Sequence, residues 1–164
     1  MEIEELKGAD WQLSSENIIK ASDCGSQFLF LDKIIKLEKN RIVAIKDVRH
    51  DEDFFKGHFV GFPIMPGALI MEGIGQAAAL LVRYSIQNHS EKYVLAYKVK
   101  EARFMAPVFP GTQLKYEVEL LAFDSRWAVL RGKAHCSGSA VAEALFMLAI
   151  VDKNEFREKH GFQA

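Results

Sequence analysis

The chain has 164 residues, of which 49% are hydrophobic, and its 21 basic and 22 acidic side chains give a net charge of −1. This length suits a single domain that can bury its core without a disulfide or metal, and the composition excludes a disordered or fibrous chain. The small net charge gives no electrostatic reason to expect nucleic acid as a partner. We therefore expect one globular domain over residues 1–164.

Three absences in the sequence predict a cytoplasmic location. The acidic N-terminus has no basic segment followed by an apolar run, so no signal peptide is predicted. No run of 18 uncharged apolar residues is present, so we expect no transmembrane helix and no membrane partner. Cys24 and Cys136 are too few for a disulfide framework and fit a reducing compartment.

The N-terminal third of the chain predicts a polar extension and then a hairpin. Residues 1–25 are weakly patterned, with one short helix expected over 15–22 that turns Ile18 and Ile19 inward. Apolar runs over 28–35 and 41–48 flank a polar turn at 38–40, which is typical of a β-hairpin.

The strongest helical signal covers residues 67–88. Its first half is apolar on nearly every face, which is typical of a buried helix. Pro66 stands just before the expected start, where the missing N–H costs nothing.

Strands dominate the rest of the chain, at 93–104, 113–120, 126–136 and 141–151, before a polar tail over 153–164 that either frays or forms a short helix. Residues 113–120 alternate strictly between apolar and polar, as in a half-buried antiparallel strand. A flat sheet cannot cover one helix on all sides. We therefore expect an α+β fold in which a curved antiparallel sheet wraps around one long central helix. Exposed strand edges then favour a homodimer.

The segment around the start of this helix contains the candidate catalytic groups. His58 lies in a loop rigidified by prolines, and Glu72 lies one turn into the apolar helix. Burial disfavours a charged carboxylate, which suits a general acid, and Gln76 lies one turn further along to hydrogen-bond it. The helix N-terminus at Gly67 offers free N–H groups. Together these groups suit proton chemistry beside a carbonyl.

The pattern alone leaves a purely structural role for His58 and Glu72 open, because single His and Glu residues occur in many proteins without chemistry. The other four histidines have no partners at metal-ligand spacing, and no dinucleotide or phosphate-binding glycine motif is present. We expect no metal and no cofactor.

Several motifs, in order from about residue 28 to 151, resemble the 3-hydroxyacyl-[acyl-carrier-protein] dehydratases of fatty acid synthesis, which have the hotdog fold. Glutamate at position 72 resembles the FabZ branch, whereas the FabA branch has aspartate there. The motifs are Phe28-Leu-Phe-Leu-Asp32, Gly57-His-Phe59, Gly61, Pro63-Ile-Met-Pro-Gly67, Glu72-Gly-Ile-Gly-Gln76, Glu101-Ala-Arg-Phe104 and Pro107-Val-Phe-Pro-Gly111.

The resemblance implies dehydration of (3R)-3-hydroxyacyl thioesters to trans-2-enoyl thioesters without a cofactor. His58 would take the C2 proton, with one ring nitrogen bonded to a nearby carbonyl such as that of Ile64. Glu72 would protonate the departing hydroxyl, and the Gly67 N–H would polarise the thioester carbonyl. In this family His58 would face Glu72 of a partner subunit, and dimers would assemble further into a hexamer, a trimer of dimers.

The resemblance also suggests residues for substrate and carrier binding. Gln76 and Gly67 are expected to contact substrate, and the aromatic side chains of Phe59, Phe62 and Phe109 to line an acyl tunnel. Carrier proteins are acidic, and we expect the acyl carrier protein to dock on basic residues of the strand predicted over residues 93–104. Those are Lys98, Lys100 and Arg103.

Three departures from the family pattern are visible. Val60 replaces a common proline, Cys24-Gly-Ser-Gln27 occupies the place of a Pro-His-Arg motif, and Met105-Ala106 replaces residues that are often basic. Two alternatives to a dehydratase stay open: a hotdog acyl thioesterase, and a non-catalytic acyl-binding hotdog module.

Overall fold

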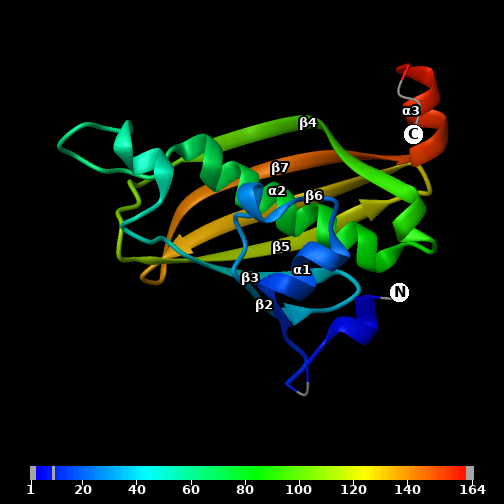
Figure 1. Ribbon diagram of the computed structural model, residues 1–164, viewed down its shortest axis with the longest axis horizontal. Coiled ribbons are helices and arrows are strands. Elements are labelled where there is room, and N and C mark those ends of the chain that lie inside the picture. Colours follow the sequence, from blue (N-terminus) through cyan, green and yellow to red (C-terminus); the bar gives the residue numbers. More distant parts are fainter. Residues whose placement is uncertain (1–2, 9, 162–164) are drawn as a thin grey trace.

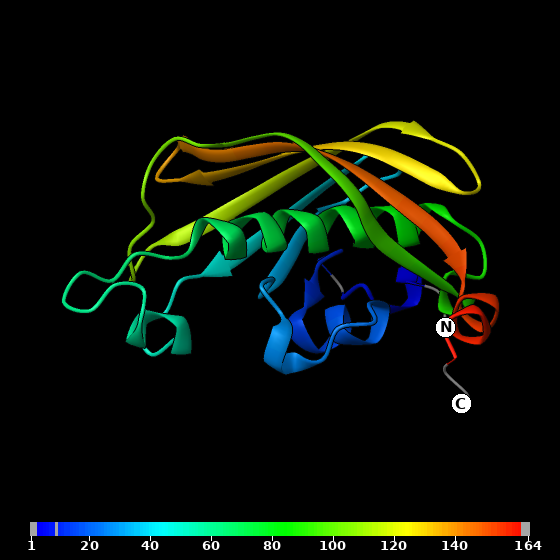
Figure 2. The ribbon, with the colours of Figure 1, turned by 90° about the horizontal axis from the view of Figure 1, so that it is seen from above.

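A computed structural model describes residues 3–8 and 10–161 as a single curved sheet wrapped around one long helix. The helix, α2 (Gly67–Ser85), lies in the concave face of the sheet, as Figures 1 and 2 show. This arrangement confirms the expected α+β fold. No helix among the described residues is long and apolar enough to cross a membrane.

The sheet has seven strands in the order β1-β2-β3-β5-β6-β7-β4, and every neighbouring pair is antiparallel. Shifts of register interrupt four of the pairings, and such bulges bend a sheet and increase its twist. The strands are β1 (Leu13–Ser14), β2 (Lys33–Leu37), β3 (Arg41–Asp47), β4 (Lys92–Phe104), β5 (Gln113–Phe123), β6 (Trp127–Cys136) and β7 (Ser139–Asp152).

The remaining elements are short. Figure 2 shows α1 on the open side of the central helix, away from the sheet, and α3 at one end of the molecule. The short helices are η1 (Ile3–Leu6), α1 (Ser15–Ala21), η2 (Ser26–Phe28), η3 (Asp53–Lys56), η4 (His89–Glu91) and α3 (Lys153–Lys159). The expected N-terminal helix is present as α1, in which Ile18 is buried and Ile19 is half-buried. The C-terminal tail begins with a short helix, α3, rather than fraying at its start.

Glycines bring α2 unusually close to the sheet. A Cβ on Gly73 would overlap the ring of Tyr116 in β5, and a Cβ on Gly132 in β6 would overlap Ile74. Both partners, Ile74 and Tyr116, are fully buried. Side chains at these two positions would push the helix away from the strands, so both glycines are required by the close packing.

Two sequence expectations about element bounds are wrong. The segment 28–31 is not a strand, because the side chain of Gln76 takes the place of a neighbouring strand: Phe30 N–H donates to Gln76 Oε1 at 2.9 Å. The central helix ends at Ser85 rather than residue 88, where Ile86 turns extended and Asn88 adopts a left-handed conformation.

Strand β4 forms a long free edge of the described sheet, since its only strand neighbour is β7. Its register sets which face each side chain occupies. Val99 pairs with the buried Phe146 on the helix side, whereas the residues at 98, 100 and 103 pair with Met147, Leu145 and Glu143 on the outer face. Large apolar side chains are exposed along this strand and just after it: Tyr97, Val99, Phe104 and Met105.

Helix–sheet packing yields a stability test. Gly73→Ala is expected to lower the free energy of unfolding by about 1–3 kcal/mol, since the new methyl group overpacks against Tyr116. Gly75→Ala is the matched control, because a Cβ there meets Phe146 at an ordinary 3.5 Å. The control is expected to be neutral or slightly stabilising, as alanine favours helix. Urea unfolding measures both, and equal destabilisation of the two variants would contradict the packing argument.

Candidate active site

His58 belongs to the segment between η3 and α2. This segment forms the protruding loop at the far left of Figure 2. The loop closes on itself through two backbone hydrogen bonds, from Phe59 N–H to Phe62 O at 3.1 Å and from Phe62 N–H to Phe59 O at 3.0 Å. Gly61 has a φ of +78°, which suits glycine in so tight a turn. The loop thereby holds His58 at its base.

The imidazole of His58 has a defined tautomer. Its Nδ1 lies 2.8 Å from the carbonyl oxygen of Ile64. A carbonyl can only accept, so Nδ1 carries the proton and Nε2 of the neutral ring keeps its lone pair. The Phe59 ring stacks on the imidazole with centroids 4.1 Å apart. The expected contact with Ile64 is confirmed, and it leaves Nε2 as a base.

The first turn of α2 lies in the same pocket as His58. This open pocket, of about 630 Å³, is lined by His58, Gly67, Ala68 and Phe104 among others. Pro66 precedes the helix, as the sequence predicts, and the first N–H groups of a helix lack acceptors within it. Phe104 covers Gly67 so closely that a Cβ there would lie 2.8 Å from the ring. A base and free N–H donors therefore share one pocket.

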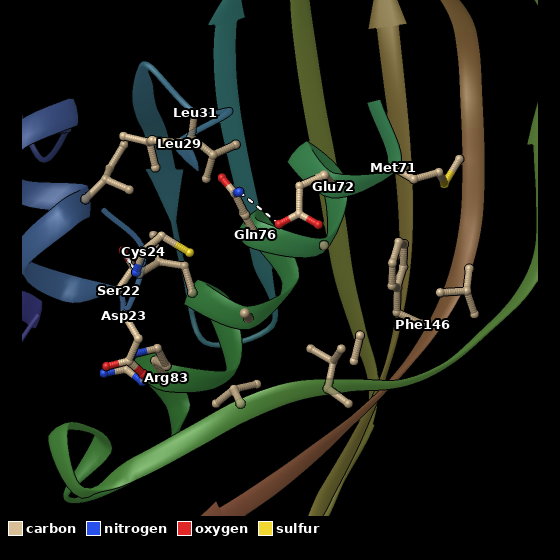
Figure 3. Close-up of a pocket in the computed structure, with 18 of the residues that line it drawn as sticks. Ser22, Asp23, Cys24, Leu29, Leu31, Met71, Glu72, Gln76, Arg83 and Phe146 are labelled. Carbon is tan, nitrogen blue, oxygen red and sulfur yellow. Dashed lines mark hydrogen bonds and ion pairs between the residues drawn. The ribbon is translucent and has the colours of Figure 1, made fainter. Parts of the chain in front are cut away.

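Glu72 is held by Gln76, one turn further along α2 (Figure 3). Gln76 Nε2 donates to Glu72 Oε1 at 2.9 Å and also to the carbonyl of Phe28 at 2.8 Å. Gln76 Oε1 accepts from Phe30 N–H. These three bonds use both amide protons and the amide oxygen. Gln76 therefore fixes one oxygen of Glu72 and leaves the other for a ligand.

A second pocket, of about 290 Å³, extends from Glu72 along α2. Its walls are largely apolar, with Leu29, Met71 and Phe146 among them, and Cys24 lies on one side (Figure 3). Burial and the negative charges of Glu72 and Asp23 raise the pKa of the Cys24 thiol, since both disfavour a thiolate. The pocket suits an aliphatic chain.

His58 and Glu72 line different pockets within one chain, and Ala68 belongs to both. The sequence predicts a helix that is buried on nearly every face. In the structure one face of α2 is only half-buried, at Met71, Glu72 and Gln76. A single described chain therefore does not bring the two candidate catalytic side chains into one pocket.

The three aromatic residues expected to line an acyl tunnel, Phe59, Phe62 and Phe109, line neither of these two pockets. Phe59 and Phe62 belong to the loop that carries His58, and Phe109 packs against Phe62. Phe59 stacks on His58, and the rings of Phe62 and Phe109 meet edge to face at 5.7 Å. All three are exposed in the single chain, and Val60 at the loop tip is 89% exposed. The loop presents an apolar surface to whatever packs against it.

The three expected docking residues, Lys98, Lys100 and Arg103, share the outer face of β4 and are exposed. Arg103 lies 3.5 Å from Glu143 and directly precedes Phe104 of the His58 pocket. Lys98 and Lys100 form no ion pair with any residue the structure describes.

Sequence reasoning missed two buried charged side chains, of which Arg83 lines the far end of the Glu72 pocket. Arg83, in the last turn of α2, is buried and pairs with Asp23 at 2.7 Å. A lone arginine in an apolar helical run was the available signal. It also missed Lys46, which is buried in β3 and pairs with Glu52 at 2.6 Å, ahead of the His58 loop.

Comparisons with known proteins agree on one family. The FabA-like domain family matches residues 24–145. The 3-hydroxyacyl-[acyl-carrier-protein] dehydratase FabZ of Solibacter usitatus is 41% identical over 128 residues, covering 78% of this chain and 79% of the relative. The dehydratase of the same name from Koribacter versatilis is 42% identical over 126 residues, covering 76% of this chain and 81% of the relative.

Solved structures agree with the hotdog architecture. The dehydratase heterocomplex ApeI:P from Xenorhabdus doucetiae gives a TM-score of 0.72 at 15% identity, covering 86% of this chain and 95% of that one. A thioesterase from Haemophilus influenzae gives 0.64 at 14% identity, covering 90% and 94%. At such low identity the likeness shows the fold alone.

Cys24 offers a probe of the charge at Glu72. We expect iodoacetamide to alkylate Cys24 with an apparent pKa above the ordinary 8.5 of a free thiol, because its thiolate is disfavoured. Glu72→Gln removes a like charge and should move the Cys24 alkylation profile to lower pH. Peptide mass spectrometry follows both thiols, with Cys136 as the internal control. An unchanged Cys24 profile in Glu72→Gln would contradict the placement of the two groups.

Proposed function

The chain belongs to the FabA-like family, and we propose that it dehydrates (3R)-3-hydroxyacyl-[acyl-carrier-protein] to the trans-2-enoyl thioester in fatty acid or related lipid synthesis. Relatives that are about 40% identical over three quarters of the chain are dehydratases of this name. The observation that supports the proposal most directly is His58, whose Nε2 is left basic in the pocket that also holds the first turn of α2.

Each step uses a group described above. The thioester carbonyl accepts from the Gly67 N–H at the positive end of α2, which stabilises negative charge on that oxygen. Nε2 of His58 removes the C2 proton, and the electrons of that C–H bond form the C2–C3 double bond. Glu72 donates its proton to the C3 hydroxyl, which leaves as water. Proton return from His58 to Glu72 completes the cycle.

Gln76 acts as a positioning residue rather than a substrate ligand. Its amide is engaged by Glu72, Phe28 and Phe30, so it has no polar atom left for the thioester. Its donation to Glu72 Oε1 orients the second carboxyl oxygen toward the pocket.

The active site is proposed to form between two subunits of a homodimer. The separation of His58 and Glu72 into two pockets supports this, as does the long free edge of β4 with its exposed apolar side chains. The apolar loop at 59–62 would then pack against the partner. Three such dimers would make the hexamer that family members are expected to form.

Water loss is the direct test of the activity. Mass spectrometry of a panel of 3-hydroxyacyl carrier thioesters should show a product lighter by one water. Release of a free thiol without that product would indicate a thioesterase instead. Binding of the acyl carrier with neither product would indicate a non-catalytic module.

His58→Ala and Glu72→Gln are each expected to lower kcat by about 10²–10⁴, the range for loss of a general acid or base. The double variant should lose little more, because both groups act in one transition state. Circular dichroism and light scattering check that folding and dimerisation survive. When the two inactive variants are refolded together, mixed dimers contain one intact site and should recover part of the activity. Mixed dimers that form without recovering turnover would refute the shared site.

An acyl carrier protein is the proposed partner, docking on the exposed side chains of Lys98, Lys100 and Arg103. Their common position on the outer face of β4 supports this role. The cytoplasm is the proposed compartment, which the free thiols of Cys24 and Cys136 suit.

Charge reversal, Lys98→Glu with Lys100→Glu, is expected to raise KM for carrier-bound substrate several-fold, and more strongly at low salt, where charges are least screened. Lys20→Glu with Lys39→Glu is the matched control, because these side chains lie on other surfaces. Steady-state kinetics at two salt concentrations measure the change. An equal loss on a small pantetheine thioester would point to a folding defect and not to docking.

A further inference from the structure

The pocket that begins at Glu72 ends at a charged group. Arg83 lies at the opposite end of the pocket from Glu72 in Figure 3, beside Asp23. Its guanidinium is held on several sides: Nε donates to Ala21 O at 2.8 Å, and Nη1 donates to Asp23 at 2.7 Å and to Lys92 O at 2.9 Å. A side chain that is 5% exposed and bonded to three residues, from the end of α1 and from the start of β4, is a fixed wall.

Two of the partners of Arg83, Ala21 and Asp23, lie outside the family-matched residues 24–145, whereas Lys92 lies within them. Asp23 follows α1 in the N-terminal extension, and it also pairs at 2.5 Å with Lys153, the first residue of α3. Arg157 of α3 donates to Tyr93 Oη at 2.9 Å, which fixes that helix against β4. Two segments added to the family domain, one from each end of the chain, therefore meet at Arg83 and brace it.

Arg83 lines both the Glu72 pocket and a further pocket of about 490 Å³, whose other walls include Tyr84, Leu120 and Phe123. Arg83 is the one lining residue that the two pockets share, so we expect truncation of its side chain to lengthen the space open to a ligand from the Glu72 side. The length available to a ligand therefore depends on this one residue.

We propose that Arg83, braced by Asp23 and Lys153, sets the upper length of the acyl chain that the protein accepts. The proposal rests on the proposed function only in taking the ligand to be an acyl thioester. Glu72 and Arg83 are eleven residues apart on α2, which corresponds to about 16 Å at about 1.5 Å per residue. An extended carbon chain advances about 1.2 Å per bond, so at most about a dozen carbons fit beyond the one that carries the hydroxyl.

The chemistry of the wall strengthens the limit. A longer chain would have to displace the Arg83 guanidinium from Asp23 and leave this buried charge without its ion-pair partner, which is costly. An apolar terminus that stops short of Arg83 instead rests among Ile18, Leu80 and Val94. Chains short enough to end there keep the ion pairs intact.

Binding of saturated acyl carriers tests the proposal without any turnover, because these thioesters lack the hydroxyl. Calorimetry with chains of four to eighteen carbons should show affinity for the wild type that rises with length and then falls for the longest chains. In Arg83→Ala the ratio of eighteen-carbon to eight-carbon affinity should rise by about tenfold or more, the scale that pocket fit supplies. Asp23 keeps Lys153 as its partner in this variant.

Two further variants make the result decisive. Arg83→Met keeps an apolar stem without the guanidinium, and it should shift the length profile in the same direction even if Arg83→Ala folds poorly. Lys115→Met is the matched control, because it removes a surface ion pair with Glu117 and lies in neither pocket wall and in no contact with Arg83. It should leave the profile unchanged.

Length profiles of Arg83→Met and Arg83→Ala that match the wild type would overturn the proposal, as would a wild type that binds the longest chains best. A dehydration assay on the same set of chain lengths tests the proposed function separately from the length limit. If the wild type binds acyl carriers with the expected length limit but never releases water, the dehydratase function fails and the length limit stands. If it dehydrates all lengths equally, the function stands and the length limit fails.

Discussion

The close approach of α2 to the concave face of the sheet is the constraint on which the site depends. Gly73 and Gly132 remove the side chains that would hold the helix off, and Tyr116 and Ile74 fill the space that this leaves. The register of α2 against the strands then decides which residues face the core. Ile70, Ile74 and Ala77 are buried against the sheet, and Glu72 and Gln76 are left on the side where a pocket opens.

The sequence predicted the helix, the four later strands and the wrapped architecture because their signals are local. The alternation in β5 and the apolar run of α2 each report which sides of one segment are covered. The segment 28–31 misled the same reasoning. It is as apolar as a strand, but its backbone partner is the amide of Gln76, 46 residues further along, and no periodicity reveals such a bond.

The residues of the candidate site likewise include some that the sequence predicted and others that it did not. His58 and its carbonyl partner lie six residues apart in a loop with two prolines, so their contact was predictable from sequence and family pattern together. Arg83 was not, because its ion-pair partner Asp23 lies 60 residues away, and Asp23 in turn pairs with Lys153 from the other end of the chain. A buried arginine is tolerated only where such partners converge, and the chain must be folded before their convergence can be seen.

The amide of Gln76 joins two parts of the molecule that differ in function. One of its protons fixes the carboxyl group of Glu72, and its other proton and its oxygen hold the backbone on either side of Leu29, a wall of the pocket. An amide group is planar and cannot turn to suit one partner without disturbing the others. A ligand that shifts Leu29 would therefore also shift the carboxyl group of Glu72. The filling of the pocket and the position of the Glu72 carboxyl are therefore mechanically coupled through one side chain.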